Sequence, residues 1–67
     1  TEDLRKKATE IYENLKEDDL NKMHREAEYS TYYRFSFEDR VNKGDIKKED
    51  ALKEVSLVLI SGRIQKN

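Results

Sequence analysis

The clearest local signal in the sequence is the stretch Gly44-Asp45-Ile46-Lys47-Lys48-Glu49-Asp50-Ala51-Leu52, which predicts the end of one helix and the start of another. Glycine readily takes the left-handed conformation just past a helix C-terminus, so Gly44 is expected to stop the preceding helix. Ile46 can pack on the first apolar residues of the next helix, and the two acids fall in its first turn, where the helix dipole favours negative charge. The next helix is therefore expected over about residues 48–61.

This predicted C-terminal helix is apolar on nearly every side from Val55 to Ile60. Leu57 falls on the side opposite the main apolar set, and Ser61-Gly62 is expected to end the helix. A helix with apolar side chains all round requires burial on more than one side. The side chains expected to form core or dimer contacts, here and at the end of the preceding helix, are Phe37, Val41, Val55, Leu57, Val58, Leu59 and Ile60.

The N-terminal part of the chain predicts a first helix over about residues 3–16. Its apolar residues recur at spacings of four, three and four and so share one helical stripe: Leu4, Ala8, Ile11 and Leu15. The stripe breaks at three consecutive acids, residues 17–19. Acids are favoured at a helix N-terminus, so we expect a short turn in which Asp18 or Asp19 caps the next helix.

A long second helix is expected over about residues 19–42. Its apolar stripe resumes at Leu20, is polar in its middle and ends at Val41, just before the glycine. The competing interpretation is a strand over residues 29–37, where aromatic and β-branched residues alternate with polar ones. A strand would need a partner, and a two-stranded ribbon alone is marginal in water. The pattern length and the terminal glycine therefore favour an all-α domain of three helices, with an α+β fold as the alternative.

Residues 29–37 also form the most unusual segment of the chain, because they hold five of its six aromatic residues. A helix packed on one side only would leave aromatic side chains exposed, and Tyr, Phe and Arg concentrate the energy of protein–protein contacts. The alternative is a helix buried on two sides. The residues expected to form an interaction surface are Tyr29, Tyr32, Tyr33, Arg34 and Phe35.

A nucleic-acid interface is the second interpretation of the same segment. Arginines near the aromatic residues could hold phosphates while the rings stack on bases. The acids Glu26, Glu28, Glu38 and Asp39 lie in the same stretch and oppose a phosphate backbone. The predicted helix over residues 48–61 is poorly suited to act as a recognition helix in the DNA major groove, because it becomes apolar where the surface that contacts the groove should be polar. Nucleic-acid binding is therefore possible but not favoured.

Composition points to a protein that is completed by a partner. Of 67 residues only 34% are apolar and 43% are charged, so the core is thin, and a chain without cysteine cannot use disulfides or thiolate zinc sites. A homodimer, or a complex with another protein, is the remaining way to add buried surface. The net charge of −1 and the longest uncharged stretch, residues 55–62, do not indicate a polyanion partner or a membrane span.

The sequence contains few residues arranged in a way that is typical of a catalytic site. The one histidine, His24, lies four residues before Glu28, and such a pair is most often a solvated helix surface rather than a proton-transfer or metal site. The two glycines stand apart, so there is no glycine-rich phosphate loop. We therefore expect one cytoplasmic, non-enzymatic helical domain over residues 1–67, with no catalytic or metal-binding residues, no cofactor, no membrane partner and no small-molecule substrate.

Overall fold

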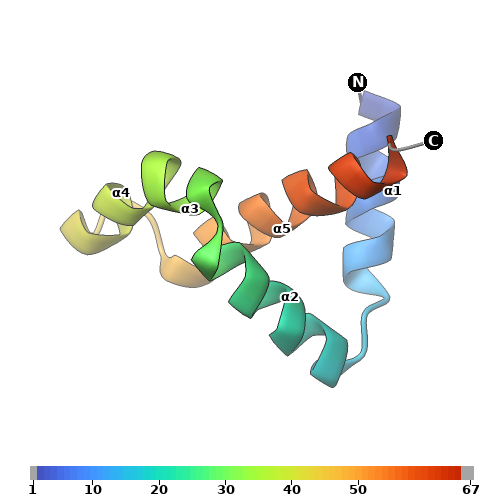
Figure 1. Cartoon of the computed structure of the whole chain (residues 1–67), viewed down its shortest axis with the longest axis horizontal. Coiled ribbons are helices and arrows are strands. Elements are labelled where there is room, and N and C mark those ends of the chain that lie inside the picture. Colours follow the sequence, from blue (N-terminus) through green and yellow to red (C-terminus); the bar gives the residue numbers. More distant parts are fainter. Residues whose placement is uncertain (1, 66–67) are drawn as a thin grey trace.

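The computed structural model describes residues 2–65, and every regular element among them is an α-helix (Figure 1). The all-α prediction is confirmed, and the alternative strand over residues 29–37 is wrong. None of the helices in these residues is long and apolar enough to cross a bilayer. The five helices described are α1 (Glu2–Glu13), α2 (Glu17–Tyr29), α3 (Thr31–Ser36), α4 (Glu38–Lys43) and α5 (Lys48–Ile64).

Helix α1 follows the predicted stripe but ends three residues early, at Glu13. The Asn14 side chain donates a hydrogen bond to the carbonyl of Glu10 (2.8 Å), which also accepts from the backbone N–H of Asn14 (3.2 Å), so Asn14 makes two contacts with the last turn of the helix. Neither Asp18 nor Asp19 caps α2, because its cap position is Lys16, which makes no side-chain hydrogen bond. The acids instead occupy the first turn of α2, where the dipole still favours them.

The predicted long helix is three shorter ones, which corrects the range 19–42. Ser30 has an extended backbone (φ −70°, ψ 141°), and its hydroxyl accepts hydrogen bonds from the backbone N–H groups of Tyr32 (3.1 Å) and Tyr33 (3.5 Å). Serine is a preferred residue at the N-cap of a helix, so the same residue, Ser30, both ends α2 and caps the start of α3. Phe37 (φ −127°, ψ −28°) makes the second break, although its carbonyl still accepts from the N–H of Val41 at 2.9 Å.

The turn after α4 confirms the sequence signal at Gly44. This residue has φ +82°, and its N–H donates to the carbonyl of Val41 at 3.1 Å, which closes the helix end. Ile46 packs against the core before α5 begins at Lys48. The predicted end of α5 at residue 61 is wrong, because the helix runs through Gly62 to Ile64.

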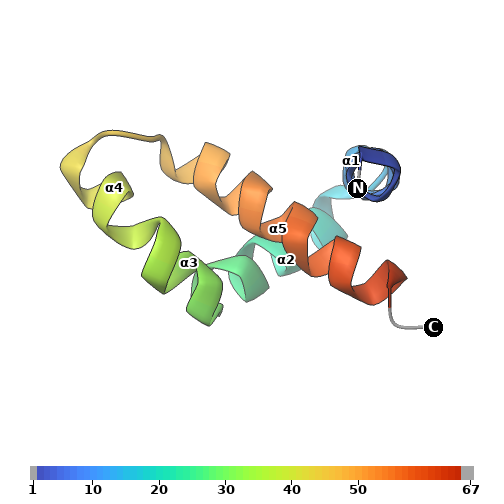
Figure 2. The ribbon, with the colours of Figure 1, turned by 90° about the horizontal axis from the view of Figure 1, so that it is seen from above.

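Helix α5 is the centre of the fold and contacts α1, α2 and α3 (Figures 1 and 2). Helices α1 and α4 lie at opposite ends of the elongated molecule, which measures 35 × 26 × 17 Å. Two core clusters follow from this arrangement, and α5 contributes to both. The first joins α1, α2 and α5 through Ala8, Met23, Leu57 and Ile60, and the second joins α2, α3 and α5 through Ala27, Tyr33, Ala51 and Val55.

Candidate functional site

Three exposed aromatic side chains stand at the junction of α2 and α3, and we call them the aromatic surface: Tyr29, Tyr32 and Phe35. They are 73%, 44% and 86% exposed, respectively. Tyr29 is the last residue of α2, and the break at Ser30 starts the new helix that carries the other two. Because Tyr32 and Phe35 are three positions apart on α3, they lie on the same side of that helix.

The aromatic surface is tied to the core through Phe37. The rings of Tyr32 and Phe37 meet edge to face, with centroids 5.8 Å apart and planes at 76°. Phe37 is half-buried against the second core cluster, and the guanidinium carbon of Arg40 lies 5.9 Å from the centre of its ring. Such edge contacts and cation–ring contacts each stabilise a local arrangement modestly. Tyr32 is therefore held in position rather than projecting freely.

One of the five residues expected on the interaction surface lies in the core instead. Tyr33 is only 4% exposed and belongs to the second core cluster, so its assignment to the surface is wrong. It follows Tyr32 directly, and a rotation of about 100° per residue turns its side chain toward α5. Arg34 is exposed and directly precedes Phe35, so it stays a predicted member of the interaction surface, although it lies two positions from Tyr32 and does not neighbour that ring along α3.

The residues expected to make core or dimer contacts mostly lie in the core. Val55, Leu57 and Ile60 are buried, which matches the expectation that α5 is covered on more than one side. The exception is Val58, which is 44% exposed. The remaining members pack, half-buried, against the second cluster: Phe37, Val41 and Leu59.

The charges beside the aromatic surface are partly neutralised within the chain. Arg63 donates a hydrogen bond to Glu26 (2.7 Å), and Lys48 pairs with Glu28. The hydrogen bond that Lys48 donates to Glu28, together with the negative charge of Glu28, raises the pKa of Lys48. The two acids of the last turns of α2 are therefore already engaged with α5.

A shallow hollow lies on α2 next to the aromatic surface. Its lining residues are Lys22, Arg25, Glu26 and Tyr29. Since Glu26 is paired with Arg63, the charges that this hollow offers to a ligand come from Lys22 and Arg25. The hollow is therefore basic and has an aromatic wall.

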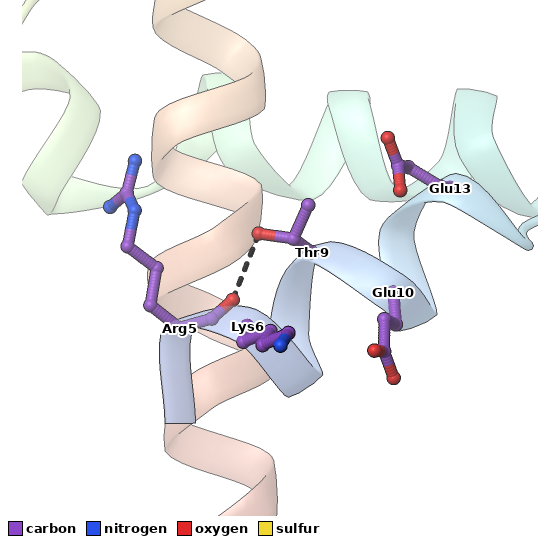
Figure 3. Close-up of a pocket in the computed structure, with 5 residues that line it drawn as sticks. All are labelled: Arg5, Lys6, Thr9, Glu10 and Glu13. Atoms are coloured by element: carbon purple, nitrogen blue, oxygen red, sulfur yellow. Dashed lines mark hydrogen bonds between the residues drawn. The ribbon is translucent and has the colours of Figure 1, made fainter. Parts of the chain in front are cut away.

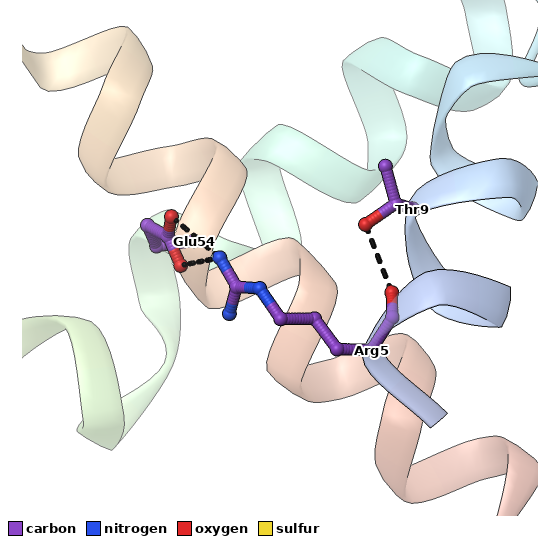
Figure 4. A network of polar contacts seen from close by, with 3 residues as sticks. All are labelled: Arg5, Thr9 and Glu54. Atoms are coloured by element: carbon purple, nitrogen blue, oxygen red, sulfur yellow. Dashed lines mark hydrogen bonds and ion pairs between the residues drawn. The ribbon is translucent and has the colours of Figure 1, made fainter. Parts of the chain in front are cut away.

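A second hollow, on the outer side of α1, has no comparable character. All of its lining side chains come from one helix: Arg5, Lys6, Thr9, Glu10 and Glu13 (Figure 3). Arg5 is already occupied, because its Nη2 donates to both carboxylate oxygens of Glu54 at 3.0 and 3.1 Å (Figure 4). Thr9 is occupied too, as it donates to the Arg5 carbonyl at 2.8 Å. This hollow is a solvated helix surface with mixed charges.

His24 is paired with Tyr12 rather than standing free beside Glu28. The Tyr12 hydroxyl lies 2.7 Å from His24 Nε2, and the two rings are 5.9 Å apart. Burial raises the pKa of Tyr12. This pair could not be predicted from the sequence, because it depends on how α1 and α2 are placed against α5. The pair is a direct contact between α1 and α2.

Among the described residues there is no group of three or more histidine, cysteine, aspartate and glutamate side chains that could hold a metal ion. Comparison with known proteins adds no further assignment, since no protein-family model, curated protein sequence or solved structure matches this chain. The aromatic surface is thus the feature of the described chain that most resembles a site.

Proposed function

We propose that this chain is a non-enzymatic protein–protein interaction module that binds its partner through the aromatic surface. The observation that carries the proposal is the exposure of Tyr29, Tyr32 and Phe35 on adjoining turns of a chain that has few apolar residues to spare. Monomeric proteins rarely leave such groups together in water, and tyrosine is enriched at binding hot spots. A regulatory role is part of the same proposal, and the cytoplasmic location stays a prediction from the sequence.

The site that supports this function is narrower than the one the sequence suggested. Apolar side chains of α5 were expected to take part, but most of them are used within the core, and Val58 is the exposed exception. Nucleic-acid binding gains no support from the surroundings of the surface. The acids Glu38 and Asp39 are exposed at the start of α4, close in sequence to Phe35, where they would repel phosphates.

Affinity capture from the native cell tests the proposal, with wild-type chain and variants as bait. Phe35→Ala should lose the captured protein, because the most exposed ring of the surface is removed. Val58→Ala is the matched control, since it truncates an exposed apolar side chain on another helix. Equal capture by all three baits would contradict the proposal, provided that circular dichroism shows the same helix content for each.

A further inference from the structure

The basic hollow beside the aromatic surface lies along one side of α2. Its lining residues stand at positions 22, 25, 26 and 29, and this spacing of three and four keeps them together on one side of an unbroken helix. Tyr29 belongs to both features, so the hollow and the aromatic surface adjoin at its ring. A partner that covers the exposed rings therefore also lies against the charges of the hollow.

Arg25 is the cation that the hollow leaves free. The two acids nearest to it on α2, Glu26 and Glu28, are both engaged by cations of α5. The residue one turn before it is the uncharged Asn21, so no free acid lies within one turn of Arg25 on either side. Arg25 is exposed and forms no ion pair among the described residues.

Lys22, the other cation of the hollow, has free acids closer to it. Asp18 and Asp19 lie three and four positions before it in the first turn of α2, although neither forms an ion pair with it. These acids partly offset the charge of Lys22. Arg25 is therefore the stronger binding group for an anion.

The five arginines of the chain fall into two groups. Arg5 and Arg63 each bind a glutamate of another helix. The three that form no ion pair among the described residues all lie on α2, α3 and α4, beside the aromatic surface: Arg25, Arg34 and Arg40. A free guanidinium suits a carboxylate, because its planar fork donates two parallel hydrogen bonds.

The free acids near these arginines are Glu38 and Asp39 at the start of α4. Arg34 and Glu38 are four positions apart, but the break at Phe37 separates their helices and no ion pair joins them. With the two α5 cations that pair there included, residues 22–40 carry an excess of two positive charges, whereas the whole chain has a net charge of −1. A partner with charges along its whole length meets the α4 acids, while a single carboxylate at the α2 end does not.

We propose that the partner of the aromatic surface is a protein segment that places an apolar side chain on the exposed rings and a carboxylate in the hollow on α2, where Arg25 binds it. The ring of Tyr29 is a wall of the hollow, so the two groups come from neighbouring residues of the segment. This inference rests on the proposed function and specifies the chemistry of its partner.

Selection from a library of random short peptides tests this chemistry, with the full chain as bait. The wild type should enrich peptides in which aspartate or glutamate stands close to an aromatic or aliphatic residue. Arg25→Glu should enrich lysine or arginine there instead, because the hollow becomes negative. Lys7→Glu, an exposed reversal on α1 with the same change of charge, should select the same peptides as the wild type.

A synthetic peptide of the enriched sequence measures the strength of the contact. Replacing its acid by the corresponding amide should weaken binding to the wild type roughly two- to tenfold, the range for a partly exposed, charge-assisted ion pair. The same replacement should leave binding to Arg25→Ala unchanged, because the group that contacts the acid is absent. Fluorescence anisotropy measures all four affinities, and circular dichroism verifies that each variant keeps its helix content.

Several outcomes would overturn the proposal. They are a selection that enriches no peptide, peptides without acids, and acids that Arg25→Glu still selects. Tighter binding of oligothymidylate than of the selected peptide would assign the surface to nucleic acid instead. Dimerisation of the wild type that Phe35→Ala abolishes, measured by sedimentation equilibrium, would make a second copy the occupant. The proposed function is decided separately: capture from the cell that depends on Phe35 supports it even where the carboxylate fails.

Discussion

Tyr12 of α1 and His24 of α2 are joined by a hydrogen bond of 2.7 Å between the phenol oxygen and Nε2. Both helices pack on α5, and this contact links them directly to each other. Lys53 of α5 approaches the same site, with Nζ 6.0 Å from the centre of the Tyr12 ring. Three helices therefore meet at one tyrosine that sits beside the first core cluster.

Replacing Tyr12 with phenylalanine should lower the free energy of unfolding by about 1 kcal/mol, the usual net contribution of a hydrogen bond. The ring and its packing remain, so the loss isolates the hydroxyl. Tyr29→Phe is the matched control, because Tyr29 is exposed and makes no side-chain hydrogen bond within the described residues. Urea denaturation of both variants measures the difference, and equal stability of the two would show that the bond contributes nothing.

The raised pKa of Tyr12 also predicts how stability changes in alkaline solution. Burial disfavours the phenolate, so the folded state holds the proton more tightly than the unfolded chain does. The contribution is complete below the unfolded pKa of about 10 and is lost as pH rises through the higher folded value. Denaturation midpoints measured above about pH 9 should therefore fall more steeply for the wild type than for Tyr12→Phe. Parallel curves would contradict the assignment.

Tyr33 and Phe35 lie on the same short helix but should respond differently to truncation. Tyr33→Ala empties a buried position in the second core cluster and should cost roughly 3–5 kcal/mol, a large share of the total stability of so small a domain. Phe35→Ala removes an exposed ring and should change stability by no more than about 0.5 kcal/mol. Thermal unfolding at low concentration compares them, and similar losses would place Phe35 in the core as well.

The helices that the sequence predicted well are those with an unbroken stripe and a distinct boundary. The apolar spacing from Leu4 onward located α1, and Gly44 with the acids after it located the start of α5. The prediction of one long second helix was wrong, because the spacing of apolar residues does not reveal a single residue with an extended backbone. Ser30 keeps its place in the stripe but caps a new helix, and its preference for that role was the available signal.

The aromatic surface could be predicted only in part, for a similar reason. Composition located it within residues 29–37, but the turn of the helix decides which rings face water. Tyr33 and Phe35 differ in exposure because α5 covers one side of α3 and not the other. The Tyr12–His24 contact could not be predicted from the sequence, since these two residues lie on different helices and are brought together by the packing of both helices on a third helix, α5.

Ser30 should therefore be a sensitive position. Ser30→Ala removes the oxygen that accepts from the N–H groups of Tyr32 and Tyr33, and should cost about 1 kcal/mol, as is typical for the loss of a helix cap. Ser30→Asp should retain most of the wild-type stability, because a carboxylate caps equally well. Chemical denaturation ranks the three proteins. If alanine equals serine, or if aspartate fails to restore stability, the cap does not hold α3 in place.

Ser56 should show the opposite behaviour. It is fully buried on α5, between the residues that serve the two core clusters, and its hydroxyl makes no hydrogen bond among the described residues. A buried polar atom without a partner costs about 1–3 kcal/mol, so Ser56→Ala should raise the free energy of unfolding by about 1 kcal/mol. Ser61→Ala, in a half-buried position of the same helix, measures the part due to the higher helix propensity of alanine, about 0.5 kcal/mol. A Ser56→Ala variant less stable than the wild type would mean that the hydroxyl has a partner in solution, such as a buried water molecule.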